Sequence, residues 1–206
     1  KSEDFVNFCI DTPLDKLNAI LIKTKDEYLK GLDIRKFSET IILLEEEKFS
    51  LVFNAFKDIL KSSADFRDIL EHLNTKQKAV VFESLKGDLH NIIESADDFG
   101  CVLEHLNTEQ RVEVYESLKG NLHNMIKSSW DFRKVIEHLN TEQKVEVYES
   151  LKSNLHNMIK SSRDFSNVIE HLNAEQITVV CEPLKGNSHN IIKSADDFRI
   201  VLGFLN

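Results

Sequence analysis

The sequence predicts an all-α fold: an α-solenoid of 33-residue helix-pair repeats, in which a short helix A precedes a long helix B. Two observations predict this fold. The dipeptide Asp-Phe recurs at steps of 33 residues, beginning at Asp65, Asp98, Asp131, Asp164 and Asp197. Within each step, apolar residues recur every three or four positions, as they do on one face of an α-helix. A single helix pair cannot bury its apolar face, whereas stacked copies can, so the array itself should be the folding unit.

The composition agrees with this fold class and narrows the function. Hydrophobic residues make up 41% and charged residues 30% of the 206 residues, and prolines and glycines are few, which disfavours all-β and disordered chains. The formal net charge of -9 predicts no nucleic-acid binding and no attachment to an anionic membrane surface. No apolar run is long enough for membrane insertion.

The cysteines indicate the redox environment. Cys9, Cys101 and Cys181 are odd in number and far apart, which fits neither a disulfide framework nor a zinc-ligand spacing. We expect buried free thiols and an intracellular, reducing environment.

The chain divides into three segments by repeat similarity. The apolar pattern of residues 1–61 predicts two diverged helix pairs, one of them a cap, with Pro13 and Asp33 at helix starts. Residues 62–193 contain four full repeats. Residues 194–206 contain a final helix A, which is either a C-terminal cap or the start of a truncated repeat.

Each helix A has a start signal. A serine is followed three residues later by the aspartate of the Asp-Phe pair, which predicts a serine N-cap and an acidic N3 residue. These serines are Ser62, Ser95, Ser128, Ser161 and Ser194. The helix should end at the following asparagine, such as Asn140, in a left-handed conformation. The same asparagine can cap helix B, with Gln143 at N3.

Helix B contains a glycine in most copies. Because the apolar period continues in phase past Gly87, Gly120 and Gly186, we expect one continuous helix, with the small residue packed close to a neighbouring backbone. The competing interpretation is a break after the preceding lysine, which gives two shorter helices. In the last full repeat, Pro183 should kink helix B.

Repeated polar residues offer no site for catalysis or for a metal. Each full repeat has one histidine at the end of helix A and one in helix B, and no two share with an acid the spacing of a helical zinc site. Adjacent Glu-His pairs such as Glu104 and His105 should point to different helix faces. No nucleotide, hydrolase or metalloprotease motif occurs. We therefore expect structural histidines, no metal, no cofactor and no enzymatic activity.

Positions that differ between the repeats are the candidates for binding. Three positions of helix A vary widely, and we expect them to be exposed because core positions tolerate less change. Trp130, the only tryptophan, stands among arginine and lysine, a composition typical of binding hot spots. The alternative is neutral drift on an unused face. The candidate partner-binding residues are Trp130, Arg133, Lys134, Arg163, Asp97, Arg67 and Asn167.

The repeated text DFxxVIEHLNTEQxxxVYESLKxNLHNMIKSS resembles the near-identical helical repeats of secreted effectors of intracellular bacteria, of the Legionella type. The resemblance covers residues 62–206. It implies translocation into a host cytoplasm and engagement of a host protein, and it carries over no catalytic residue.

These observations predict a non-enzymatic protein-protein interaction scaffold, either an effector or the interaction domain of one. An architectural or self-associating rod is the alternative, and an enzyme with an unrecognised site is third. No signal in the sequence identifies the partner or the oligomeric state.

Overall fold

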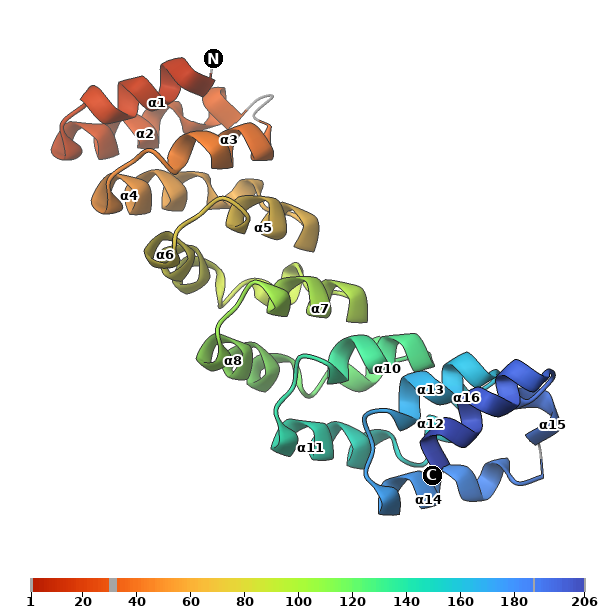
Figure 1. The fold of residues 1–206 in the computed structure, drawn as a ribbon. Helices are drawn as coiled ribbons and strands as arrows, with labels where there is room; N and C mark the ends of the chain where they lie inside the picture. The colour runs from red at the N-terminus through yellow and green to blue at the C-terminus, as the bar shows by residue number, and fades with distance from the viewer. Residues whose placement is uncertain (1, 30–32, 187, 206) are drawn as a thin grey trace. The chain divides into compact units, whose positions relative to one another are not determined.

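The computed structural model describes residues 2–29, 33–186 and 188–205, and these residues form helices joined by short turns, with no strand among them (Figure 1). The helices form two compact units. Unit 1 comprises Lys1–Ile93 with His105–Gln110, and unit 2 comprises Glu94–Glu104 with Arg111–Asn206.

Unit 1 consists of two helical layers. One layer contains α1 (Ser2–Asp11), α3 (Ile34–Ile41) and α5 (Ser63–Leu70), and the other contains α2 (Leu14–Leu29), α4 (Glu46–Phe56) and α6 (Thr75–Leu85). The short helices η1 (Lys57–Ile59) and η2 (Leu89–Asn91) follow α4 and α6. Aromatic side chains fill the space between the layers. The Phe56 ring lies 5.4 Å from the Phe5 ring and 5.5 Å from the Phe37 ring, measured between centroids.

Unit 2 repeats the same arrangement. The A helices are α7 (Ala96–Glu104), α10 (Ser129–Ile136), α13 (Ser162–Ile169) and α16 (Ala195–Leu205), and each packs on the next. The opposite layer contains α8 (Thr108–Leu118), whose first turn belongs to unit 1, α11 (Thr141–Leu151) and α14 (Ala174–Cys181). The short helices α9 (Leu122–Met125), α12 (Leu155–Met158), η3 (Glu182–Leu184) and α15 (Ser188–Ile191) complete the unit.

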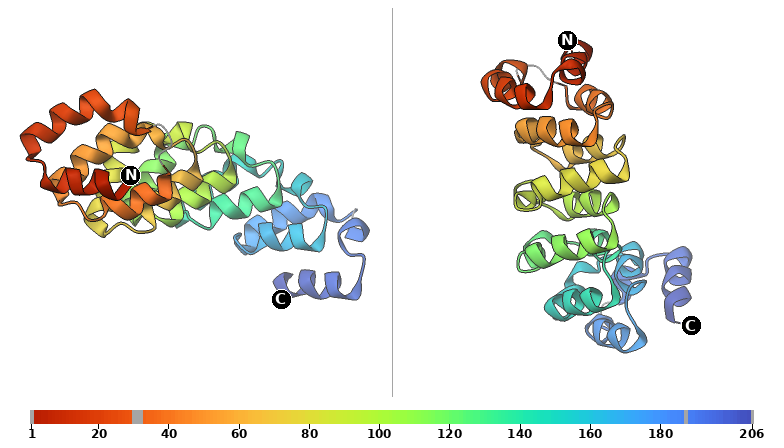
Figure 2. Two further views of the ribbon diagram at one scale, coloured as in Figure 1. Left: turned by 90° about the horizontal axis from the view of Figure 1, so that it is seen from above. Right: turned by 90° about the vertical axis from the view of Figure 1, so that its left-hand side faces the viewer.

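Successive helices pack on one another in the series α1–α3–α5 and α2–α4–α6 of unit 1 and in the series α7–α10–α13–α16 of unit 2. Figure 2 shows both units from two further sides. Because each helix pair buries its apolar face mainly against the adjacent pair, the architecture is an α-solenoid, as the repeat predicts. The A-helix phenylalanines Phe66, Phe99, Phe132 and Phe165 are all buried.

The predicted N-caps of the A helices are confirmed. The backbone N–H of each Asp-Phe aspartate donates to the serine hydroxyl three residues earlier, at 3.1 to 3.2 Å, in all five copies. The capping box of helix B is confirmed as well. At Asn140 the side chain accepts from the Gln143 N–H, and the Gln143 side chain accepts from the Asn140 N–H. Asn140 is extended (φ -76°, ψ 174°), however, so the expected left-handed end of helix A is wrong.

Helix B is not continuous, and the competing interpretation of a break is correct. Helix α8 ends at Leu118, the N–H of Asn121 donates to the Leu118 carbonyl at 2.8 Å, and α9 begins at Leu122. Both leucines are buried across this tight turn, so the apolar period continues although the helix does not. Glycine and asparagine favour the turn because they are poor helix formers. The close-packing explanation also fails, since a Cβ on Gly120 would meet no atom within 4 Å.

Pro183 ends an α-helix rather than kinking it. Helix α14 has 8 residues whereas α8 and α11 have 11, and Pro183 lies in the 3-10 helix η3 that follows. Among the cysteines, Cys9 is fully buried as expected, whereas Cys101 and Cys181 are only half-buried. Among the described residues, no helix combines the length and apolarity that a membrane span requires.

Candidate binding surface

A polar network joins the N-terminal ends of the helices α10, α13 and α16 in unit 2. The Ser129 hydroxyl donates to the Asp164 carboxylate at 2.5 Å, and Ser162 donates in the same way to Asp197 one repeat later. Each of these aspartates also accepts from the backbone just before its own helix, from Lys160 and Lys193 respectively. The carboxylates therefore cap their helices and link neighbouring repeats, which fixes the spacing of the A helices.

The expectation that Asn167 is exposed is wrong. Its side chain is buried, with 4% of the residue exposed, and its Nδ2 donates to the Ser129 hydroxyl at 3.3 Å. A polar residue can stand at this buried position because Ser129 satisfies it. The residue type at this position therefore depends on the side chain that it contacts in the neighbouring helix, and its variation between repeats does not indicate an exposed binding residue.

Trp130 lies at the centre of a cationic group on α10. The residue is 43% exposed, and its ring has the Lys134 ammonium 5.2 Å and the Arg133 guanidinium 5.9 Å from its centroid. Positions three and four residues apart share one helix face, which places both cations over the indole. Arg133 also donates from Nε to Glu137 Oε1 at 2.6 Å. The structure thus brings together three of the predicted residues.

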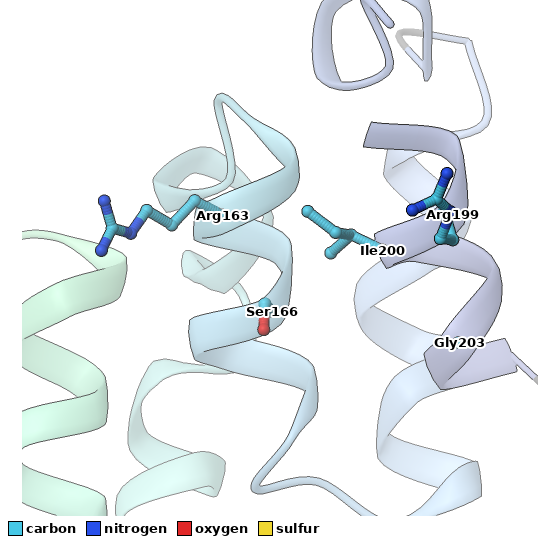
Figure 3. A pocket seen from close by; sticks show the side chains of 5 residues that line it. All are labelled: Arg163, Ser166, Arg199, Ile200 and Gly203. Carbon is cyan, nitrogen blue, oxygen red and sulfur yellow. The ribbon is translucent and has the colours of Figure 1, made fainter. Parts of the chain in front are cut away.

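A hollow of about 560 Å³ lies between α13 and α16. It is lined by Arg163, Ser166, Arg199, Ile200 and Gly203. In Figure 3 Ile200 projects from α16 towards α13, whereas the Arg163 side chain extends from α13 away from α16. Arg163 is exposed and occupies on α13 the repeat position that Trp130 occupies on α10.

We define the A-helix surface as the Trp130 group together with the residues lining this hollow. Its members are Trp130, Arg133, Lys134, Arg163, Ser166, Arg199, Ile200 and Gly203. The two remaining predicted residues are exposed as well: Asp97 occupies the repeat position of Trp130 on α7, which packs on α10, and Arg67 is on α5 of unit 1. Sequence reasoning missed Gly203, although glycine stands there in place of the glutamate of the four preceding repeats, Glu71, Glu104, Glu137 and Glu170.

Hydrogen bonds hold the capping aspartate Asp164 in its ionised form. Burial opposes ionisation of Asp164, but hydrogen bonds from Ser129, Ser161 and the Lys160 backbone outweigh it and lower the pKa of the carboxyl. The Asp164 carboxylate thus accepts its hydrogen bonds from donors within the protein. On the same surface Arg163 is exposed, Lys134 lies over the Trp130 ring, and Arg199 is paired with Asp196 at 3.4 Å.

The comparisons with known proteins concern the fold. No protein-family model matches the chain, and no curated protein matches it. A similar solved structure is described as the Puf3 RNA binding domain bound to Cox17 RNA 3′ UTR recognition sequence site B. It superposes with a TM-score of 0.59 at 17% sequence identity, covering 95% of this chain and 59% of that chain. The chain thus spans about three-fifths of the length of that domain and shares its helical-repeat fold.

This neighbour corrects one expectation from the sequence. The prediction of a protein partner and no nucleic acid is contradicted, because a domain of the same fold binds RNA. The prediction rested on a net charge, which sums over the whole chain, whereas a ligand meets only the charges on one face. The resemblance to secreted bacterial effectors, the absence of enzymatic activity and the self-associating rod stay predictions.

Proposed function

We propose that the chain is a helical-repeat scaffold that binds single-stranded RNA on the A-helix surface of unit 2. The observation that supports this most is the exposed Trp130, flanked by two cations and followed one repeat later by Arg163. Proteins that bind single strands combine aromatic side chains, on which bases stack, with cations along the backbone path. The fold of the RNA-bound neighbour supports the same ligand class.

The geometry favours an unpaired strand over a duplex. An indole that is 43% exposed offers a face to a free base, but the bases of a duplex are already stacked on one another. Arg163 lies on the next A helix, α13, where it can meet a phosphate next to the stacked base. The hollow between α13 and α16, with Ile200 in its wall, is wide enough to receive a neighbouring base.

The acidic composition predicts weak binding that depends on few phosphate contacts. Arg133 is already paired with Glu137, and Arg199 with Asp196 at 3.4 Å, so Lys134 and Arg163 are the cations of this surface that we expect to meet phosphates. Two contacts with a single strand give a slope of about -1.4 in a plot of log affinity against log salt concentration.

Fluorescence anisotropy with labelled single-stranded RNA of mixed sequence tests the proposal. Trp130→Ala should weaken binding by roughly fivefold or more, because stacking of one base on an aromatic ring contributes about 1–3 kcal/mol. Val145→Ala is the matched control, since Val145 is an exposed apolar residue of α11, in the opposite layer. A duplex of the same length should compete poorly.

Two results would contradict the proposed function. One is the absence of saturable binding at low salt. The other is equal affinity for the Trp130→Ala and Val145→Ala variants, which would move the binding site away from α10.

A further inference from the structure

The stacking of 33-residue repeats brings equivalent residues of neighbouring A helices together, and one such group contains metal-ligand atoms. Glu137 is the C-cap of α10, and Glu170 is the C-cap of α13 and precedes His171. One side-chain ligand atom from each of the three lies within 4.8 Å of the other two. A search for ligands within one helix could not find this group, since two of its members are 33 residues apart.

The imidazole of His171 is turned towards the carboxylates. Its side chain is 11% exposed, and its Nε2 is buried without a hydrogen-bond partner. The nearest carboxylate oxygen, Oε1 of Glu170, lies 3.9 Å from Nε2, too far for a hydrogen bond. The expectation that adjacent Glu-His pairs face apart therefore fails here, because α13 ends at Ile169 and the chain turns.

The unpaired nitrogen of His171 is distinguished by the groups beside it. Nδ1 of His72, at the same position of the first full repeat, is likewise buried without a hydrogen-bond partner. Beside His171, the carboxylates of Glu137 and Glu170 lie within 4.8 Å, so a cation bound there would have three ligand atoms and would satisfy the buried nitrogen.

The corresponding histidine of the preceding repeat is placed differently. His138 packs against α7, where its Nε2 lies 3.4 Å from the position that a Cβ on Gly100 would take. Helix α10 has Arg133 at the repeat position of Gly100, so His171 has no such space and lies beside the carboxylates instead. Helix α16 has Gly203 at the position of Glu170. Among the described residues, the Glu-Glu-His group is found at the α10–α13 contact.

We propose that Glu137, Glu170 and His171 form a divalent-metal site that bridges α10 and α13 and takes Zn²⁺. One imidazole nitrogen and two carboxylate oxygens suit zinc, which binds such atoms at about 2.0–2.2 Å and can complete its shell with water. Magnesium and calcium prefer shells made of oxygen alone. Nε2 and Oε1, now 3.9 Å apart, need only small side-chain rotations to bind one ion.

Arg133 competes with the metal for one ligand. Its Nε donates to Oε1 of Glu137 at 2.6 Å, which leaves the second carboxylate oxygen for the ion. A guanidinium at this place also repels a second cation. Replacing Arg133 with a neutral side chain should therefore tighten metal binding, a response that a purely structural ion pair does not predict.

Isothermal titration of the full chain with zinc chloride tests the site. We expect one equivalent to bind, at least tenfold weaker affinity in Glu170→Gln and His171→Asn, and a several-fold gain in Arg133→Gln. His138→Asn is the matched control, because it removes the same residue type at the same repeat position and should leave the affinity unchanged. Thermal melts of each apo variant establish that it is folded.

The proposal is overturned if no one-equivalent binding occurs in the wild type. It is overturned equally if His138→Asn loses as much affinity as His171→Asn, which would indicate scattered surface binding. The titration contains no RNA, so its result is independent of the proposed RNA-binding function.

Discussion

At the scale of single residues, those that recur in every repeat were easier to interpret from the sequence than those that do not. The copied serines, aspartates and asparagines cap helices as predicted, because a cap depends on residues within one turn that the sequence displays directly. Among uncopied residues, Trp130 is exposed as predicted, whereas Asn167 is buried against Ser129. A contact between residues 38 positions apart leaves no local signal, so the sequence could not separate these two cases.

A glycine substitution tests the turn inside helix B. Gly120→Ala should raise the free energy of unfolding by about 0.5–1 kcal/mol, because alanine restricts the unfolded chain. A Cβ at this position meets no atom within 4 Å, and Ser153 occupies it in the next repeat. Urea denaturation measures the change, and a clear loss of stability would show that the turn requires glycine.

The buried histidines predict how stability depends on pH. Burial lowers the pKa of both His138 and His171 from the ordinary value of 6.5, with Arg111 reinforcing the effect at His138. Below pH 6.5 the unfolded chain therefore binds more protons than the folded chain, so stability falls as the pH is lowered from about 7 to about 5. The carboxyls with lowered pKa, Glu137 and Asp164, act only in a more acidic range.

Urea denaturation at several pH values between about 5 and 7.5 checks this prediction. The double variant His138→Asn/His171→Asn should show a flatter dependence of stability on pH. An unchanged slope would mean that other groups dominate this range.

At the scale of elements, the sequence predicts helix starts better than helix continuity. Starts depend on capping residues, whereas the break after Leu118 retains the apolar period of a continuous helix, so periodicity alone cannot detect it. A glycine at this point of the apolar period is compatible with a continuous helix and with a broken one. Only the packing of α9 and α12 as separate short helices decides between them.

The link between neighbouring A helices predicts unequal effects of two equivalent substitutions. Asp164 caps α13 and also accepts from Ser129, whereas Asp131 caps α10 but faces Ala96, which has no hydroxyl at the equivalent position. Asp164→Ala should therefore destabilise the protein by about 1.5 kcal/mol more than Asp131→Ala, the typical contribution of a hydrogen bond to a charged group. Equal losses in thermal or urea denaturation would show that the link between the helices contributes nothing.

At the scale of the whole molecule, the 33-residue period was sufficient to predict an α-solenoid, because only stacked pairs can bury the repeated apolar face. The sequence offered no comparable argument about the ligand. The expectation of no nucleic acid rested on a sum of charges, whereas Arg163 and Arg199 line one hollow only because α13 and α16 stack. The sequence likewise could not show the place of Gly203, because the hollow that it lines with Ile200 exists only in the folded chain.

Photocrosslinking of single-stranded RNA to the full chain, with the crosslinked peptides located by mass spectrometry, tests the central claim most directly. The proposed function predicts crosslinks on α10 and α13, centred on Trp130 and Arg163, and their loss in Trp130→Ala. Crosslinks confined to the layer of α8, α11 and α14, or none above background, would contradict it.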